Sequence, residues 1–232
     1  MKVLVTGAAG GIGAATAALF ERGGHEVLRQ DLRAAPGIDL AADLLDSDGL
    51  ETVIRVARER GVDTVVAAHG SAGPGALATV SDDYIARILR LNASSVFALY
   101  EGLAAALVRA DGAFIAVSSQ AGIVGEAQNA VYCAAKFSLV GWAEGVSSGP
   151  RSPRMRIVCP GLTETPLLVD GLRGMAAEQG LSYEEFLAIR LVGMPMSRLG
   201  RPAEIGRAIL WLAELETRRN VVAAVTGGLV FD

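Results

Sequence analysis

Apolar runs of strand length alternate with helical patterns along nearly the whole sequence. The runs are apolar throughout, which is typical of parallel strands that helices cover on both faces. We therefore predict an α/β fold with a single doubly wound parallel sheet, in one domain over residues 1–232. The expected strands are Lys2–Thr6, His25–Gln30, Ile38–Leu40, Asp63–Ala68, Ala113–Ser118, Arg156–Cys159 and a closing strand within Val221–Phe231.

Helical patterns fill the intervals between these runs. Residues 162–200 hold two short helical patterns broken by glycines and a proline. They predict a small helical lid insertion over the carboxyl edge of the sheet, where such folds bind ligands. The alternative is an ordinary excursion between two elements. The other expected helices are Ala14–Arg22, Gly49–Arg60, two segments within Ser81–Ala110 with Ser81 as N-cap, Asn129–Gly145 and Pro202–Leu215.

Composition narrows the class of protein. Of the 232 residues, 51% are hydrophobic and 20% are charged, so we expect a large buried core. The formal net charge is −4, and no run of Lys or Arg occurs, which argues against nucleic acid and membranes as partners. The sequence has only two cysteines, which is consistent with a reducing cytoplasm. With two histidines and no cluster of cysteines, we expect no metal site. The apolar stretch Val96–Val108 is too short to cross a bilayer, and we predict no signal peptide.

A glycine-rich turn, Thr6–Gly13, follows the first strand and opens the first helix. Gly7 permits the tight turn, Gly11 lets the backbone approach a pyrophosphate beside Ile12, and Gly13 lets the helix and strand pack closely. The free N–H groups and partial positive charge of the helix N-terminus favour an anion. The turn therefore predicts a dinucleotide site.

Asp31 ends the second expected strand. A carboxylate there can accept hydrogen bonds from the adenosine-ribose hydroxyls and repels a 2′-phosphate, which favours NAD over NADP. Arg33 could instead pair with such a phosphate, and a solvated loop aspartate is the third possibility. NAD is the predicted cofactor.

Tyr132 and Lys136 are four positions apart in a helical pattern, so they share one helix face. A phenol with a pKa of about 10 is a poor base near neutrality. A neighbouring ammonium and an oxidised nicotinamide would both stabilise the phenolate; a pKa lower by ~3 units requires about 4 kcal/mol. Such a pair suits general acid/base catalysis, although the same spacing also occurs in helix faces that only pack.

Three other polar residues support this pair. Ser118 and Ser119 lie just past the fifth expected strand, at the edge where catalytic groups gather. Asn92 lies where one helical segment passes into the next, which is consistent with a side chain that satisfies an interrupted helix backbone.

With these motifs in order, the whole chain resembles the short-chain dehydrogenase/reductase family. The resemblance implies a Rossmann fold, and a narrower one, over Arg29–Arg33 and Pro160–Leu168, is to bacterial NAD-dependent hydroxysteroid dehydrogenase/carbonyl reductases. The motifs that carry it are Thr6–Gly13, Ser119, Tyr132, Lys136, Pro160–Thr165, Arg198–Ile205 and Thr226–Gly227.

The resemblance also implies roles. Tyr132 would be the acid/base, Lys136 would lower its pKa and hold the nicotinamide ribose, and Ser119 would bind the substrate oxygen. Asn92 would position a water that relays protons from Lys136. The cofactor contacts implied besides the glycine turn and Asp31 are Asp43 and Leu44 near adenine, Gly70, Pro160, Thr163 and Thr165.

The chain departs from the family after the fourth strand. The family usually has Asn-Asn-Ala-Gly, whereas this sequence has Ala-Ala-His-Gly at 67–70. The asparagines that brace neighbouring strands are absent, so local rigidity is in doubt. We expect His69 to be a loop histidine bonded to backbone rather than a catalytic group.

Substrate and assembly follow less directly. Family members form tetramers through the helices that correspond to Ser94–Val108 and Val131–Gly145, so a homotetramer or homodimer is expected, although the chain ends at Phe231-Asp232 where relatives continue.

The function expected is interconversion of a secondary alcohol and a ketone on an apolar alicyclic, aromatic or steroid-like small molecule. The rivals are a 3-oxoacyl thioester reductase and a non-catalytic dinucleotide-binding protein. Apolar residues of the insertion could line the cleft or pack the lid: Leu167, Leu168, Met175, Phe186, Leu191, Met194 and Met196.

Overall fold

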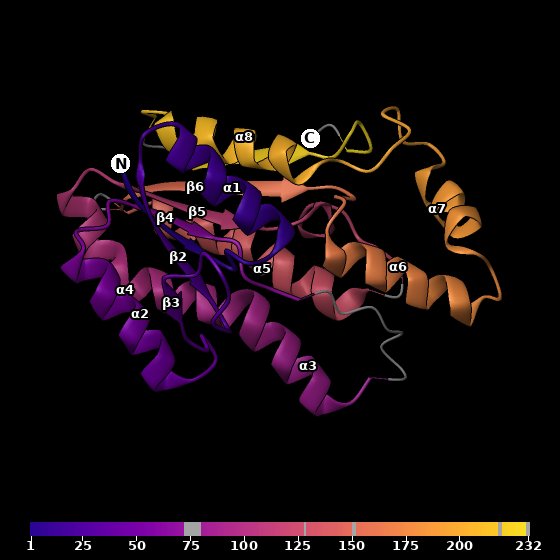
Figure 1. Ribbon diagram of the computed structural model, residues 1–232, viewed down its shortest axis with the longest axis horizontal. Helices are drawn as coiled ribbons and strands as arrows, with labels where there is room; N and C mark the ends of the chain where they lie inside the picture. The colour runs from indigo at the N-terminus through magenta and orange to yellow at the C-terminus, as the bar shows by residue number, and fades with distance from the viewer. Residues whose placement is uncertain (72–79, 128, 150–151, 218–219, 231–232) are drawn as a thin grey trace.

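Seven parallel strands form one sheet in the order β3-β2-β1-β4-β5-β6-β7 (Figure 1). The computed structural model describes residues 1–71, 80–127, 129–149, 152–217 and 220–230. The order reverses between β1 and β4, and in such sheets ligands bind at the carboxyl ends of the strands on either side of this point. The strands are β1 (Lys2–Thr6), β2 (Glu26–Asp31), β3 (Leu40–Ala41), β4 (Thr64–Ala67), β5 (Ala113–Val117), β6 (Arg154–Pro160) and β7 (Val221–Val225).

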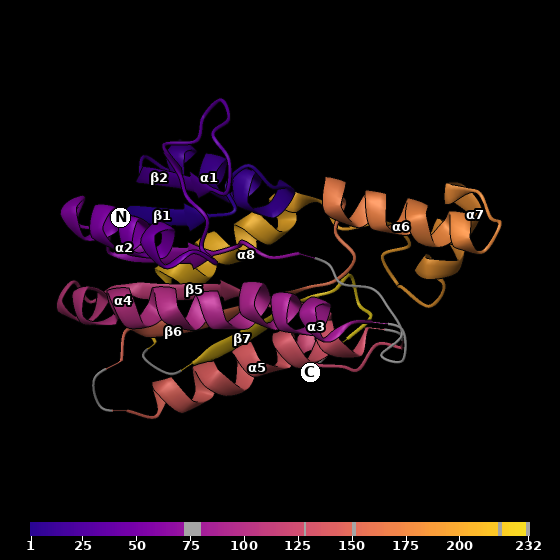
Figure 2. The ribbon, with the colours of Figure 1, turned by 90° about the horizontal axis from the view of Figure 1, so that it is seen from below.

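Helices cover both faces of the sheet, as predicted. One face packs under α1 (Gly11–Arg22) and α8 (Pro202–Glu214), with Phe20 and Ile209 fully buried between helices and strands. The other face packs under α2 (Ser47–Glu59), α4 (Ser95–Arg109) and α5 (Ala130–Ser147) (Figure 2). The sequence and structure therefore agree on a doubly wound Rossmann fold.

The two helical segments expected within 81–110 form a continuous helical stretch. α3 (Asp82–Leu89), with Ser81 as its N-cap, passes through a π turn at Arg90–Ser94 into α4. Among the described residues, this 28-residue stretch is the one helix long and apolar enough to cross a membrane by length and composition alone. Its α4 part buries Leu99, Leu103 and Leu107 against the sheet, as core helices that pass the same test do.

Strand boundaries differ from the prediction chiefly at β3 and β6. The third strand comprises Leu40–Ala41 rather than Ile38–Leu40. β6 begins at Arg154, two residues before its predicted start, so Arg156 lies inside the strand. The fully buried guanidinium of Arg156 donates to the carbonyl oxygens of Leu212 and Leu215 at the end of α8. An arginine can therefore lie in a central strand where helix-terminal carbonyls accept its hydrogen bonds.

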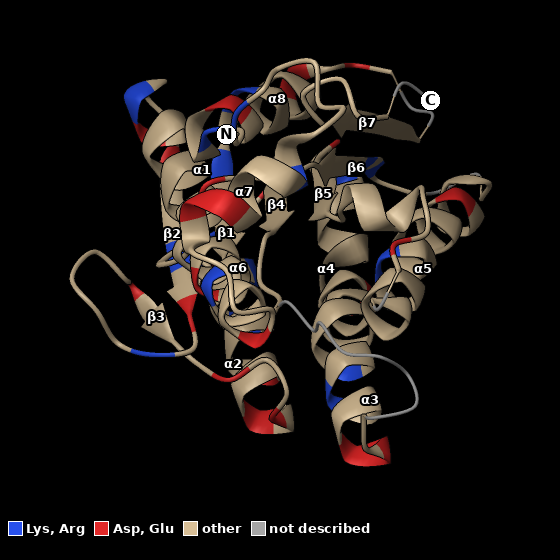
Figure 3. Cartoon of the chain, turned by 90° about the vertical axis from the view of Figure 1, so that its right-hand side faces the viewer, with Lys and Arg blue, Asp and Glu red and all other residues tan. Residues whose placement is uncertain are grey.

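The predicted helical insertion consists of α6 (Pro166–Glu178) and α7 (Tyr183–Leu191). Both helices project past the carboxyl ends of the strands, and in Figure 3, which faces this end of the molecule, they lie in front of the sheet. Thr165 caps α6, and Ser182 and Glu185 form a capping box at α7. Leu172, Ala176 and Phe186 make a small separate core between the two helices.

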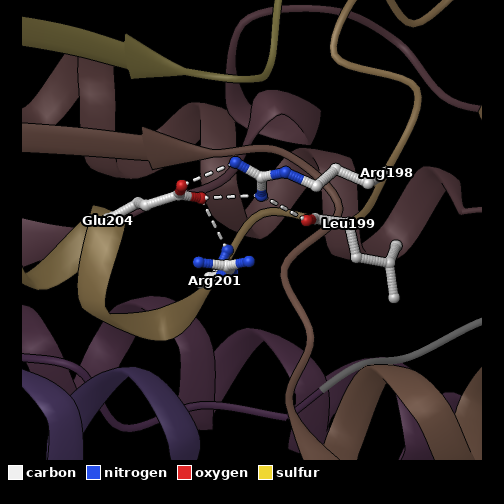
Figure 4. Close-up of polar contacts among 4 residues, drawn as sticks. All are labelled: Arg198, Leu199, Arg201 and Glu204. Carbon is white, nitrogen blue, oxygen red and sulfur yellow. Dashed lines mark hydrogen bonds and ion pairs between the residues drawn. The ribbon is translucent and has the colours of Figure 1, made fainter.

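An ion pair between Arg198 and Glu204 lies in the segment that leads from the insertion to α8. Both guanidinium Nη atoms of Arg198 contact the carboxylate of Glu204, at 2.7 and 3.1 Å, and one of them also donates to the carbonyl of Leu199 (Figure 4). The same carboxylate accepts from the backbone N–H of Arg201 at 2.8 Å. The hydrogen bond from Arg198 lowers the pKa of Glu204 to about 2. The segment that leads into α8 is thus held by one carboxylate.

Candidate active site

The glycine turn has the close backbone approaches that its sequence predicts. Gly7 has φ +66°, and a Cβ there would lie 2.9 Å from the carbonyl oxygen of Ala68. A Cβ on Gly13 would lie 2.1 Å from the carbonyl oxygen of Gly7, and one on Gly11 would lie 2.6 Å from Cγ2 of Thr165. The N-cap of α1 is Gly10, which has no side chain to bond the free N–H groups of the first turn. The turn therefore fits the pyrophosphate of a dinucleotide, whose oxygens can take the free N–H groups.

Asp31 lies beside this turn at the end of β2. One carboxylate oxygen accepts from the backbone N–H of Ala9 and the other from that of Leu32, both at 2.8 Å. These bonds fix a negative charge beside the glycine turn, where a nucleotide ribose would lie. Arg29, the nearest preceding arginine, is engaged elsewhere in a bidentate pair with Glu21. Arg33 is exposed in the following loop.

A cavity of about 230 Å³ opens next to the glycine turn, at the carboxyl edge of the sheet. The residues expected in the site that line this cavity together are Ile12, Gly70, Asn92, Ser119, Tyr132, Lys136, Pro160, Thr163 and Thr165. Asp43 and Leu44 do not line it: the Asp43 carboxylate accepts from the N–H of Leu45, and the side chain of Leu44 is buried in the core.

Ser119, Tyr132 and Lys136 line the cavity together with His69 and Asn92, and we refer to these five residues as its floor. Tyr132 and Lys136 lie one turn apart on α5, with Lys136 Nζ 5.6 Å from the centre of the Tyr132 ring. Lys136 Nζ donates to the carbonyl oxygen of Val117 at 3.0 Å. Ser118 Oγ donates to the carbonyl oxygen of Lys136 at 2.9 Å. The end of β5 and the first turns of α5 are therefore joined by two buried hydrogen bonds.

In the chain alone, burial dominates the pKa of the Tyr132 phenol. Burial raises this pKa to about 12, a hydrogen bond with Ser119 opposes the rise, and the charge of Glu126 adds to it. Burial also lowers the pKa of Lys136 to about 8. Without a nicotinamide charge beside it, the phenol is therefore protonated at neutral pH. A lowered pKa was expected from Lys136 and an oxidised nicotinamide together, and this stays a prediction; in the chain alone, desolvation of the phenolate sets the direction.

Asn92 lies in the π turn, as its position between two helical segments suggested. Its side-chain N–H donates to the carbonyl oxygen of Ile88 at 3.1 Å, and its Oδ1 accepts from the backbone N–H of Ser71 at 3.3 Å. The asparagine side chain therefore bonds the helix backbone at the π turn. The position of a Gly70 Cβ would be 2.7 Å from Asn92 Oδ1 and 3.6 Å from Lys136 Nζ, so the two side chains converge at Gly70.

We expected the His69 side chain to bond to backbone. Instead, its imidazole bridges two other side chains. Its Nδ1 is 2.6 Å from Thr6 Oγ1 at the end of β1, and its Nε2 is 3.0 Å from Ser95 Oγ at the start of α4. Ser95 donates its own hydrogen to the carbonyl oxygen of Leu91, so it accepts from His69, and Thr6 donates to the imidazole. Burial, and then the charge of Lys136, lower the pKa of His69 to about 3.

A neutral imidazole, just past the end of β4, thus connects β1 and the start of α4. This is the bracing that the missing family asparagines had put in doubt. No sequence pattern showed it, because its partners are 63 and 26 residues away in the chain.

A carboxylate held by two amides is the part of the cavity that sequence reasoning missed. Glu126 accepts from Gln120 Nε2 at 2.9 Å and from Asn129 Nδ2 at 2.8 Å, and all three residues line the cavity. The signal available was an acidic residue between Ser119 and Tyr132. We refer to Gln120, Glu126 and Asn129 as the amide–carboxylate cluster.

The apolar residues of the insertion divide between the two roles considered. Leu167, Leu168 and Met175 line the cavity, together with Arg190 from α7. Phe186 is buried in the insertion's own core, and Met194 and Met196 pack near Gly227. Both alternatives are therefore correct, each for part of the set.

Comparisons with known proteins agree with this geometry. A family model described as Enoyl-(Acyl carrier protein) reductase matches residues 7–227. The 3-oxoacyl-[acyl-carrier-protein] reductase FabG of Thermotoga maritima is 28% identical over 98% of this chain and 96% of its own length.

Two solved structures share the fold. A variant of actinorhodin polyketide ketoreductase with NADPH superposes with a TM-score of 0.89 at 23% identity, over 98% of this chain and 96% of its own. Ligand-free aldohexose dehydrogenase of Thermoplasma acidophilum superposes with a TM-score of 0.87 at 24% identity, over 98% and 93% of the two chains.

Proposed function

The chain belongs to the short-chain dehydrogenase/reductase family of nicotinamide-dinucleotide oxidoreductases, and from this premise we propose that it interconverts a secondary alcohol and a ketone. The observation that carries the proposal is that Ser119, Tyr132 and Lys136 line one cavity beside the glycine turn. The loss of the tyrosine or the lysine would be expected in a member that only binds dinucleotide. Both are present.

Each side chain has a role that its surroundings support. Tyr132 holds a proton at its phenol oxygen and would give it to a ketone oxygen, or take one from an alcohol. The Ser119 hydroxyl would orient that same substrate oxygen. Lys136 would hold the nicotinamide ribose and stabilise the phenolate, and Asn92 would order a water between Lys136 and solvent. When bound, the nicotinamide supplies or accepts the hydride.

The cofactor we propose is NAD. This proposal is supported by the carboxylate of Asp31, which two backbone N–H groups hold beside the glycine turn. There it would accept hydrogen bonds from the ribose hydroxyls and repel a 2′-phosphate. The actinorhodin ketoreductase structure, in contrast, contains NADPH. Steady-state kinetics with both cofactors test the proposal, with Asp31→Asn as the variant. We expect wild type to prefer NAD and the variant to use NADP about tenfold better relative to NAD; a wild-type preference for NADPH would contradict the assignment.

For the substrate we propose an apolar alicyclic, aromatic or steroid-like alcohol or ketone, because Leu167, Leu168 and Met175 line the cavity. The second candidate is a 3-oxoacyl thioester, which the name of the Thermotoga maritima relative favours. A spectrophotometric panel of secondary alcohols, cyclic ketones and 3-oxoacyl thioesters separates the two. Turnover of thioesters alone would reject the first candidate.

We also propose a homotetramer or homodimer in the cytoplasm. On α5, Ala134, Phe137 and Gly141 are exposed, so this helix has an uncovered apolar strip. Cys133 and Cys159 are both free and buried, as a reducing compartment allows. Light scattering that gives a monomer mass would reject the assembly.

A further inference from the structure

The amide–carboxylate cluster closes the loop between the two hydroxyls that are proposed to hold the substrate oxygen. Ser119 lies just past β5, with Gln120 directly after it, and Asn129 is the N-cap of α5, whose first turn carries Tyr132. One carboxylate oxygen of Glu126 accepts from Gln120 Nε2 at 2.9 Å, and the other accepts from Asn129 Nδ2 at 2.8 Å. A single carboxylate therefore joins the two ends of the loop.

The main chain of Glu126 is bonded to the same end of α5. Its N–H donates to Sγ of Cys133 at 3.4 Å, and its carbonyl oxygen accepts from the backbone N–H of Asn129 at 3.3 Å. Glu126 is thus fixed to the first turn of α5 through its backbone as well as its side chain. The bond from Gln120 then carries this attachment to the other end of the loop.

The opposite side of the site is tied separately. Lys136 Nζ donates to the carbonyl oxygen of Val117, and Ser118 Oγ donates to the carbonyl oxygen of Lys136, in two buried hydrogen bonds. These bonds fix α5 to the end of β5 and involve no residue of the loop. The orientation of Ser119 relative to Tyr132 therefore also depends on how the loop is closed.

We propose that Glu126 is a positioning residue, whose carboxylate holds the loop closed and so sets the distance between the Ser119 hydroxyl and the Tyr132 phenol. This inference rests on the proposed function, in which both groups bond the same substrate oxygen. Both must then lie within hydrogen-bond reach of one atom, and a displacement of about 1 Å is enough to lower a rate strongly. Hydrogen bonds to a carboxylate suit this task, because they are shorter and stronger than neutral ones.

The same carboxylate acts on the phenol through its charge. Burial, opposed by a hydrogen bond with Ser119, raises the pKa of Tyr132, and the charge of Glu126 raises it further. A neutral side chain of the same size would keep the loop closed without this effect, so the two roles can be separated. The other titratable groups around the phenol and the lysine are Lys136 and Cys133 on α5, Cys159 in β6, His69 after β4 and Arg190 at the rim of the cavity.

The test compares two substitutions of Glu126 in the oxidation of 1-indanol. Glu126→Ala removes both the loop closure and the charge. Glu126→Gln removes the charge alone, because its amide can bond both neighbours once one of them turns over. At the pH plateau, we expect kcat/KM to fall about tenfold in the alanine variant and to stay within about twofold of wild type in the glutamine variant. The matched control, Glu178→Ala, changes an exposed residue on α6 outside the cavity and should equal wild type.

A double-mutant cycle with Ser119 separates positioning from general damage to the fold. If Glu126 acts by orienting the Ser119 hydroxyl, its loss should matter little once that hydroxyl is gone. We expect Glu126→Ala to lower kcat/KM by less than about twofold in a Ser119→Ala background. Damage unrelated to Ser119 would lower it about tenfold in both backgrounds.

The pH profile measures the charge by itself. Because the carboxylate raises the pKa of Tyr132, the phenolate should form at lower pH in Glu126→Gln, and the profile of 1-indanol oxidation should move to lower pH. Glu126→Asp keeps the charge but is one methylene shorter, so it should lose rate and keep the wild-type profile. This variant replaces the alanine variant if circular dichroism shows the latter to be unfolded.

Equal kcat/KM for wild type and the alanine variant would overturn the inference, as would equal losses in the two backgrounds of the cycle. A loss in Glu126→Gln as large as in Glu126→Ala would also reject it, because the charge would then account for the whole effect. If wild type turns over no alcohol or ketone of the panel with either cofactor, the proposed function is wrong. Hydrogen exchange of residues 119–133 then tests the loop closure alone: faster exchange in the alanine variant only supports it, and equal exchange in all three proteins rejects it.

Discussion

The floor of the cavity and the insertion over it are built differently. On the floor, the polar side chains of Asn92, His69 and Lys136 are bonded to buried backbone or to neighbouring side chains. The insertion has a core of its own between α6 and α7. It adjoins the rest of the chain through Thr165 at the glycine turn and through the Arg198–Glu204 pair.

This difference separates chemistry from selectivity. Groups on the floor are held by interactions that do not need a substrate, so their geometry is set when the sheet and its helices fold. The insertion exposes large apolar side chains such as Leu167, which is 52% exposed, and Val192, which is 78% exposed. Exposed side chains of this kind can be substituted to suit another substrate without altering the geometry of the floor. The predictions below test this separation.

The largest effect is expected at Tyr132. Replacement by Phe removes the proton-transfer group on the floor and should lower kcat/KM by about 10³-fold, within the range for general acid/base groups. Dinucleotide affinity, measured by fluorescence titration, should change far less. The matched control is Tyr183→Phe in the insertion, which should keep most of the activity. Retention of more than a tenth of the activity by Tyr132→Phe would contradict the assignment.

His69→Ala should destabilise the whole fold. It leaves the hydroxyls of Thr6 and Ser95 without the imidazole that joins them, so we expect a loss of about 2–3 kcal/mol in the free energy of unfolding. Urea titration measures this loss. His69→Asn, which can still bond one of the two partners, should recover part of it. Equal stability of wild type and the alanine variant would show that the bridge is not structural.

His69 should also make the fold sensitive to acid. Its pKa is about 3 in the folded protein against 6.5 for the free side chain, so the folded state resists protonation. The stability that follows is fully present above pH 6.5 and is lost as the pH falls toward 3, by roughly 2 kcal/mol between pH 6.5 and 5. Urea titrations at both pH values should show a smaller loss in His69→Asn. The activity profile should lack a step near pH 6.5 from this residue.

Phe186→Ala should act on the insertion alone. Phe186 is 5% exposed in the small core between α6 and α7, so its loss loosens these helices while the sheet stays folded. We expect KM for apolar substrates to rise about tenfold, with kcat within a few-fold of wild type and the urea midpoint nearly unchanged. A large fall in the midpoint would mean that the insertion and the floor unfold as one unit.

The smallest effect is expected at Glu204. Glu204→Gln weakens the pair with Arg198, which is 43% exposed, and exposed pairs contribute about 1 kcal/mol or less. The pKa of Glu204, about 2, means that this contribution is present above pH 4.5 and is lost as the pH falls toward 2. Urea titration at pH 7 measures it. A loss above 3 kcal/mol would show that the return segment is essential to the floor.

Much of the fold and site could be predicted from local patterns. Apolar runs identified the strands, and the turn at Thr6–Gly13 identified the start of α1, because both depend on short-range sterics and burial. The spacing of Tyr132 and Lys136 placed them on one face of a helix for the same reason. The hydrogen-bond partners of the buried Arg156 in β6 could not be predicted, because they come from the end of α8. The extent to which burial raises the pKa of Tyr132 could not be predicted either, because burial is a property of the packed chain.

The sequence by itself determined the order of strands and helices, the glycine turn and the presence of residues proposed to transfer a proton. Only the tertiary structure decided that His69 joins β1 to α4, and that Glu126 is held by two amides. The physical reason is that hydrogen-bond partners and desolvation depend on which distant segments meet. Periodicity and spacing describe neighbours along the chain and carry no information about such meetings.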